Sequence, residues 1–126
     1  LESSELLRGS PLHASLERAF AFTEQLGVDQ QTGAVRAMLD LGPDGASRDA
    51  TQRIWAQAEY LRALTLRPGS EAAVLRQLQA LQQRSLHAGG WYECRDEQGE
   101  VSRLDMPSTT PYHLATCYRG LAEYLR

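Results

Sequence analysis

The chain has 126 residues, a charged fraction of 23% and a formal net charge of −3, which together indicate one globular domain spanning residues 1–126. This mild acidity offers no electrostatic footprint for nucleic acid, and no apolar run approaches the roughly 20 residues of a membrane span, so we expect neither partner. The two cysteines show no metal-ligand spacing and make no disulfide scaffold. We therefore expect no metal, no cofactor and a cytoplasmic protein, whose native start lies upstream of Leu1.

The first half of the sequence predicts two helices joined by an extended segment. Ser10 is a suitable N-cap and Pro11 suits the first helical position, and apolar residues at helical spacing then run to Gly27. Residues 34–50 are typical of a small hairpin or an extended loop, because they hold the turn sequence Gly42-Pro43-Asp44-Gly45. A second helix is expected from about Thr51 to Leu66, ahead of Pro68-Gly69.

The second half predicts the same order of elements. A third helix is capped by Ser70 and broken by Gly89-Gly90, and its apolar stripe consists of Val74, Leu78, Leu81 and Ser85, broadened by Leu75 and Leu86. The segment from Trp91 to Arg103 is expected to be extended, with a polar turn at 96–99. A fourth helix begins near Pro111 and carries Leu114, Cys117, Tyr118, Leu121 and Leu125.

Corresponding positions of the two halves lie at a constant distance in sequence. Gly45 and Gly99 are 54 positions apart, and so are Glu59 and His113. Units of paired helices with a long loop on one face bury their apolar faces against neighbouring units. We therefore predict an all-α fold, an α/α toroid of which this chain forms a fragment, with short β-hairpins in its loops.

His113 is the candidate catalytic residue. It follows the polar loop 108–111 and Tyr112 at the start of the last predicted helix. An imidazole that titrates near pH 6.5 moves protons in either direction, which suits abstraction of a proton next to a carbonyl. The alternative is a structural histidine bonded to a neighbouring carbonyl group.

Trp55 and Glu59 are candidates for substrate binding. They are four residues apart and share one helix face, so they form an aromatic platform beside a carboxylate, which suits a sugar ring. The alternative is an ordinary amphipathic helix with a weak surface pair between Glu59 and Arg62. Arg53 lies on a different face near the helix start, from which it could reach a developing oxyanion.

The segment after the diglycine carries two aromatic side chains and an acid. Strand alternation places Trp91 and Glu93 on one side and Tyr92 on the other. We expect Trp91 to pack on the next helix.

Three motifs in order resemble the C-terminal part of the N-acylglucosamine 2-epimerase superfamily, across nearly the whole chain. They are Arg53-x-Trp55-x-Gln57-Ala58-Glu59, Gly89-Gly90-Trp91-Tyr92-Glu93 and Pro107-x-x-x-Pro111-Tyr112-His113. The superfamily includes mannose isomerases and proteins called mannose-6-phosphate isomerases. The resemblance implies an (α/α)6 barrel and a metal-independent transfer of the C2 proton of a sugar through an enediolate, with two histidines as acid and base.

The resemblance assigns His113 to the second of these histidines. The first belongs to a Pro-Gly-His-x-x-Glu element that this chain lacks, so the rest of a parent barrel is an expected partner and the fragment alone is expected to be inactive. Ser108 is a further candidate for substrate binding, because it stands where the resembling cellobiose epimerases carry a tryptophan. Its small side chain favours a monosaccharide or sugar phosphate such as mannose or N-acylglucosamine. Isomerase and epimerase remain alternatives, and a homodimer is left open.

Two rival functions fit the same elements. One is an α/α-toroid glycoside hydrolase that would use two carboxylates among Asp40, Glu59, Glu93 and Asp105. The other is a non-catalytic helical repeat that binds a partner protein, in which Trp55 and His113 would be buried or scattered.

Overall fold

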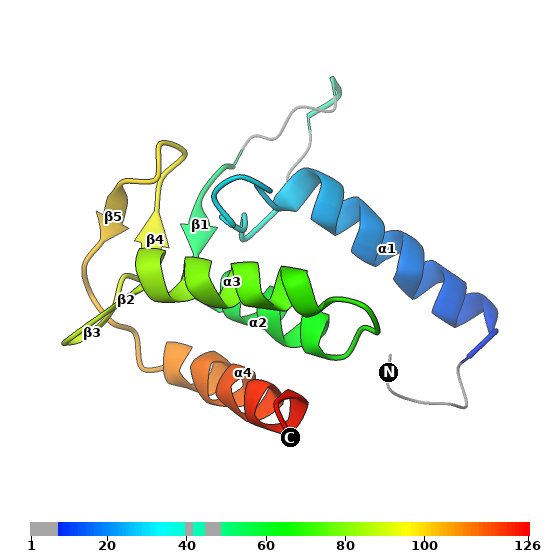
Figure 1. Ribbon diagram of the computed structural model, residues 1–126. Helices are drawn as coiled ribbons and strands as arrows, with labels where there is room; N and C mark the ends of the chain where they lie inside the picture. The colour runs from blue at the N-terminus through cyan, green and yellow to red at the C-terminus, as the bar shows by residue number, and fades with distance from the viewer. Residues whose placement is uncertain (1–7, 40–41, 45–48) are drawn as a thin grey trace.

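The computed structural model describes residues 8–39, 42–44 and 49–126. About half of the chain is helical, in α1 (Pro11–Gly27), α2 (Ile54–Thr65), α3 (Glu71–Arg84) and α4 (Thr110–Tyr124). Short strands lie between them: β1 (Gln52–Arg53), β2 (Leu86–His87), β3 (Gly90–Trp91), β4 (Cys94–Arg95) and β5 (Val101–Arg103). Successive helices alternate in direction, so α2 and α4 both begin at the end of the molecule where β1, β4 and β5 lie (Figure 1).

Helix α1 has the predicted limits. The Ser10 hydroxyl accepts a hydrogen bond from the backbone N–H of His13 at 3.1 Å, and the helix ends at Gly27. Side chains tie α1 to the segments that follow it: Arg67 forms a two-bond ion pair with Glu17 at 2.9 and 2.7 Å. The same guanidinium lies 3.9 Å from the centre of the Phe20 ring.

Helix α2 begins three residues later than the sequence predicts, at Ile54. Gln52 and Arg53 instead form β1, which pairs antiparallel with β4. The sheet continues to the first helical residue, because the Ile54 N–H donates to the Glu93 carbonyl at 3.2 Å. Of the predicted hairpin at 34–50, the described part shows two isolated bridges, Val28 to Val35 and Arg36 to Gln52. Gly45 and its side of the predicted turn fall outside the described residues.

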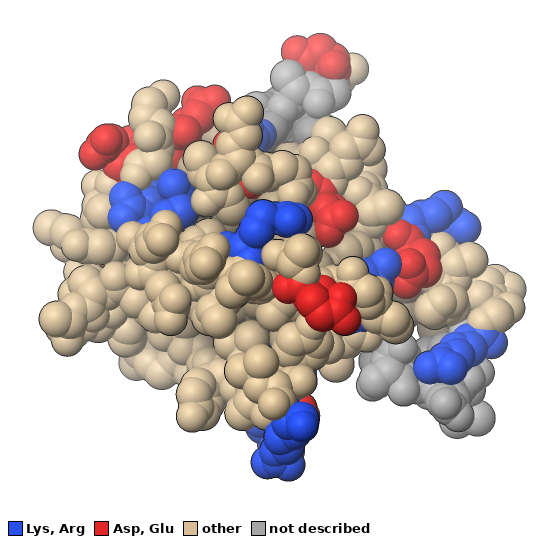
Figure 2. Space-filling model, viewed as in Figure 1, with Lys and Arg blue, Asp and Glu red and all other residues tan. Residues whose placement is uncertain are grey.

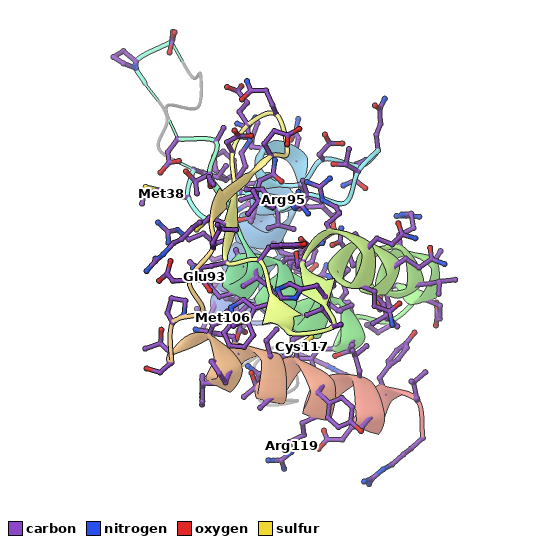
Figure 3. All side chains as sticks on the ribbon, turned by 90° about the vertical axis from the view of Figure 1, so that its left-hand side faces the viewer. Met38, Glu93, Arg95, Met106, Cys117 and Arg119 are labelled. Atoms are coloured by element: carbon purple, nitrogen blue, oxygen red, sulfur yellow. The ribbon has the colours of Figure 1, made fainter. Side chains whose placement is uncertain are left out.

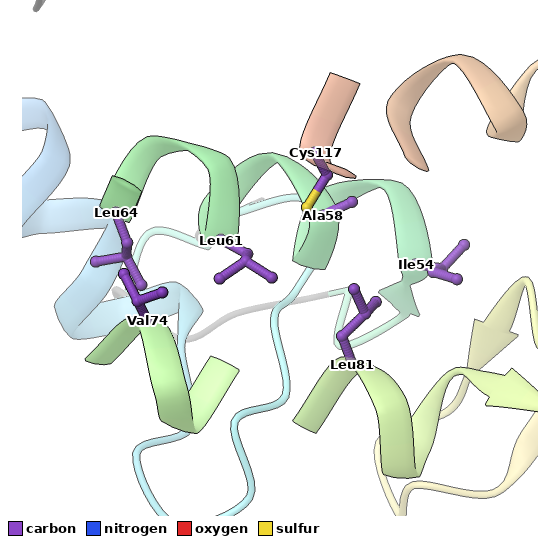
Figure 4. Close-up of a cluster of buried hydrophobic side chains, with 7 residues drawn as sticks. All are labelled: Ile54, Ala58, Leu61, Leu64, Val74, Leu81 and Cys117. Carbon is purple, nitrogen blue, oxygen red and sulfur yellow. The ribbon is translucent and has the colours of Figure 1, made fainter. Parts of the chain in front are cut away.

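The main hydrophobic core lies where α2 is packed between α3 and α4 (Figure 4). Helix α2 contributes the most side chains to it, and the buried members are Ile54, Ala58, Leu61, Leu64, Val74, Leu81 and Cys117. Trp91 packs against the same cluster, to which α2, α3 and α4 all contribute. The central position of α2 holds its two neighbours in fixed places relative to each other.

The predicted apolar stripes of α3 and α4 are too broad. Leu75 is 56% exposed and Leu86 38% exposed, and Leu86 lies in β2 because α3 ends at Arg84 and the chain then folds back to pair with β3. On α4, Tyr118 and Leu125 are also exposed. This exposure follows because α3 and α4 are each packed on one side. In the described structure each of them contacts α2, and no other helix to a comparable extent.

The predicted polar turn at 96–99 connects β4 and β5. The Asp96 carboxylate accepts from the backbone N–H groups of Gln98 at 3.0 Å and Glu100 at 2.9 Å, and Gly99 has a φ of 83° that favours glycine. Across the face in Figure 2, basic and acidic side chains are interspersed. No helix within the described ranges is long and apolar enough to cross a membrane.

Candidate active site

A cavity of about 550 Å³ opens at the end of the molecule where α2 and α4 begin. Its wall combines the start of both helices with the β4–β5 region and the loop before α4. The lining residues are Arg53, Trp55, Glu93, Arg103, Pro107, Thr109, Thr110 and His113. Three residues predicted from sequence, Arg53, Trp55 and His113, therefore share one cavity wall.

Glu59 and His113 meet across the interface of α2 and α4. The Nδ1 atom of His113 lies 2.9 Å from a Glu59 carboxylate oxygen, and the two side chains are 32% and 34% exposed. A carboxylate at Nδ1 favours the tautomer with its proton on that nitrogen, which leaves Nε2 to exchange protons.

Trp55 lies beside the same imidazole. The two ring centres are 5.7 Å apart with an interplanar angle of 37°. Tyr112 meets His113 edge-on at 5.6 Å, but the tyrosine itself is exposed. The indole offers an apolar face on which a ring substrate can stack, and the imidazole beside it can exchange protons with that substrate.

Glu59 also takes part in the surface pair that the alternative interpretation predicts. Its second oxygen lies 3.4 Å from an Arg62 nitrogen, in an exposed contact. Such a pair contributes little to stability. The two contacts use different oxygens, so Glu59 orients the imidazole and holds Arg62 at the same time.

The two arginines of the cavity differ in their surroundings. Arg103 forms a two-bond ion pair with Asp105 at 2.5 and 2.7 Å, and this hydrogen bonding lowers the pKa of the Asp105 carboxyl group. Arg53 is half-buried in β1, directly ahead of α2. Its guanidinium is thus the better placed of the two to meet negative charge on a ligand.

Ser108 is not part of the cavity wall. Its neighbours Pro107 and Thr109 line the cavity, while Ser108 itself is exposed. The structure therefore does not place Ser108 with Trp55 and His113, and the predicted contact between Ser108 and substrate has no geometric support here.

The lining residues that sequence reasoning did not assign to the isomerase site include Thr110 and Glu93, the second of which it named only for the glycoside hydrolase alternative. Glu93 is 3% exposed, and one of its carboxylate oxygens accepts from the Trp91 indole N–H at 3.0 Å and from the Thr110 hydroxyl at 2.8 Å. Figure 3 shows Glu93 beside α2 and near the start of α4. The predicted alternation of Trp91 and Glu93 was the available signal for one of these contacts; nothing in the local sequence indicated Thr110.

A second, apolar hollow of about 430 Å³ lies between α1 and α2. Its wall includes Phe20, Val35, Tyr60 and Ala63, together with Trp55 and Glu59. Trp55 therefore borders both hollows. Within the described ranges, no group of three histidine, cysteine or acidic side chains is arranged to hold a metal ion.

No protein-family model matches this sequence, and no curated protein matches it. The structure is similar to a crystal structure of D-mannose isomerase, with a TM-score of 0.67 and 23% sequence identity. The likeness covers 94% of this chain and 34% of that chain, so this chain spans about a third of the isomerase's length. The order and packing of the four helices described here are therefore a fold shared with part of a D-mannose isomerase.

Proposed function

We propose that this chain forms part of the active site of a sugar isomerase or 2-epimerase that transfers the C2 proton of a monosaccharide or sugar phosphate through an enediolate. The observation that carries the proposal is that His113 and Trp55 line one cavity in contact with each other, while Glu59 contacts the His113 imidazole from the neighbouring turn of α2. The likeness to a D-mannose isomerase supports it independently at the level of the fold.

The geometry suggests a role for each residue. Nε2 of His113 exchanges a proton with the substrate while Glu59 stabilises the charged imidazole. Trp55 supports the apolar face of the sugar, and Arg53 stabilises the oxyanion of the enediolate. Return of the proton to C1 gives the ketose, and return to the opposite face of C2 gives the epimer; the second acid/base group would come from the histidine that the resemblance places elsewhere in the parent barrel.

The cavity volume favours a small substrate. A volume of about 550 Å³ is in the range of small-molecule sites, and a single sugar ring would fill it in part. Mannose is the first substrate to try, because the structural neighbour is a D-mannose isomerase. A phosphate group on the sugar would find a counter-charge in Arg53.

The proposal includes the rest of a toroidal parent as the partner of this chain. Its support is that the likeness covers 34% of the isomerase chain, and that the resemblance assigns the first of the two histidines to a Pro-Gly-His-x-x-Glu element that is not found in these 126 residues. We expect the isolated chain to show no turnover of mannose, because half of the acid/base pair would be missing.

Conversion of mannose to fructose by the full-length protein containing this chain is the direct test. Replacement of His113 by Ala should lower kcat by at least about 100-fold, the usual share of a general acid/base. His13→Ala is the matched control, since this histidine lies in the first turn of α1 and its backbone N–H bond to Ser10 survives the change. Equal losses in both variants, or an unchanged rate in His113→Ala, would refute the assigned role.

The glycoside hydrolase alternative has less support from the carboxylates available. Glu93 is occupied by two donors and Asp105 by Arg103, while Asp40 lies outside the described residues. A hydrolase would release sugar from a glycoside without exchanging the C2 hydrogen with solvent, so incubation with aryl glycosides distinguishes the two functions.

A further inference from the structure

Glu93 connects the starts of both helices that carry the candidate site. Its backbone carbonyl accepts from the N–H of Ile54, the first residue of α2, at 3.2 Å. Its side chain accepts from the hydroxyl of Thr110, the first residue of α4, at 2.8 Å. Glu93 therefore holds the first residue of α2, which precedes Trp55, and the first residue of α4, which lies about one turn before His113.

The carboxylate of Glu93 is held in a single orientation. The Trp91 indole N–H donates to the same oxygen as Thr110, at 3.0 Å, and Trp91 packs against the main hydrophobic core. Burying a carboxylate lowers the stability of the fold unless the carboxylate accepts hydrogen bonds, so the loss of either donor should be unfavourable. Movement of Thr110 away from Glu93 would leave a buried acceptor without one of its donors.

The start of α4 has no side-chain cap of its own, and its first residue bonds to Glu93 instead. Its N-cap residue, Thr109, makes no capping hydrogen bond with its side chain. The Thr110 hydroxyl is directed across the cavity wall to Glu93 instead of to its own helix. Thr110 and His113 are three residues apart and share a helix face, so the position of one sets the position of the other.

We propose that Glu93 is a positioning residue for the proposed proton transfer, acting through Thr110 to hold His113 against Trp55 and Glu59. The kinetic part of this inference rests on the proposed function; the structural part does not. Glu93 also holds α2, but through its backbone, so changes to the side chains of Glu93 or Thr110 release α4 and leave the substrate-binding wall on α2 in place.

Thr110→Val is the principal test in the full-length protein, because it removes the hydroxyl and retains the branched shape. We expect kcat to fall by at least about tenfold while KM changes less than about threefold, as a displaced catalytic group costs rate more than binding. Thr110→Ser should restore most of the rate. Thr65→Val is the matched control for the loss of a threonine hydroxyl: it removes the exposed bond from the Thr65 hydroxyl to the Arg62 carbonyl at 2.6 Å, at the opposite end of α2.

Glu93→Leu provides a second variant of the same contact. It removes the acceptor of both side-chain bonds, so kcat should fall at least as far as in Thr110→Val. Glu93→Gln retains an acceptor oxygen and should lose less. The Glu93 variants are compared with Thr65→Val in melting temperature and in kcat. If they lower the melting temperature but lower kcat no more than Thr65→Val does, Glu93 is only structural.

A second readout tests the positioning without any turnover. The Trp55 ring lies close enough to His113 to shift the imidazole proton resonances by its ring current. In Thr110→Val these resonances should move toward their values in an unfolded peptide, whereas in Thr110→Ser and Thr65→Val they should stay. Resonances that stay in Thr110→Val would overturn the inference; resonances that move in a protein that does not isomerise sugars would uphold the positioning and refute the proposed function alone.

Discussion

At the residue scale, the contact of the Glu59 carboxylate with Nδ1 of His113 is the one on which the proposed proton transfer depends most. Glu59→Gln retains an acceptor for Nδ1 but removes the negative charge that stabilises the imidazolium, so we expect kcat to fall by about tenfold or more. Steady-state kinetics with mannose measures this. Glu123→Gln is the control, because Glu123 forms an exposed pair with Arg119 within α4 and does not line the cavity. A wild-type rate in Glu59→Gln would show that the 2.9 Å contact is structural only.

Trp55 should affect binding more than rate. Trp55→Ala removes the aromatic platform, and with a stacking contribution of about 0.5–1.5 kcal/mol we expect KM to rise by about three- to tenfold. Trp55→Phe should recover part of this loss. If kcat collapses while KM is unchanged, Trp55 supports His113 and does not contact the sugar.

Some residues of the site could be found from sequence and others could not. Glu59 and His113 were recognisable as corresponding positions of two similar halves, and the structure brings them together. Glu93 and Thr110 were not, because their contact joins a strand and a helix 17 residues apart and follows no helical or strand period. Ser108 was assigned by analogy with a tryptophan position, and its small side chain does not reach the cavity wall.

At the scale of elements, the stability of the site depends on the packing of α2. Leu61 is 0% exposed in the centre of the core, so Leu61→Ala should lower the free energy of unfolding by about 2–5 kcal/mol. Leu75→Ala removes the same atoms from a side chain that is 56% exposed and should cost less than about 0.5 kcal/mol. Urea denaturation of the two variants measures the difference, and equal losses would contradict the described packing of α2 and α3.

The interface of α2 and α4 should also respond to high pH through Cys117. Burial raises the pKa of the Cys117 thiol to about 11, with a smaller contribution from Glu59. The thiol of the unfolded chain ionises near pH 9, so between about pH 9 and 11 the unfolded state loses its proton first and the free energy of unfolding falls as pH rises. Denaturation at pH 8 and pH 10 should show a larger fall in the wild type than in Cys117→Ala; equal falls would mean that the thiol is accessible to water.

The helices were predictable from local signals, and their ends only where a cap was local. Ser10 and Pro11 fixed the start of α1, because the capping bond lies within three residues. The start of α2 was predicted too early, because Gln52 and Arg53 prefer a sheet whose partner strand lies some 40 residues later. The local sequence around Gln52 and Arg53 does not indicate this long-range strand pairing.

At the scale of the whole molecule, α2 and α4 both start at the same end (Figure 1). The cavity opens at that end, and residues from both helix starts line it. The four helices occur in the predicted order, and the shared fold with part of a D-mannose isomerase extends over 94% of the chain. Closure into a toroid stays a prediction, because it concerns elements beyond these 126 residues.

Exchange of the C2 hydrogen with solvent tests the central role of His113 most directly. The full-length protein would be incubated with mannose in D₂O, and deuterium at C2 of the recovered sugar followed by NMR. We predict exchange with the wild type and at least about 100-fold slower exchange with His113→Asn. Exchange at the wild-type rate in the variant would contradict the assignment of His113 as the group that moves this proton.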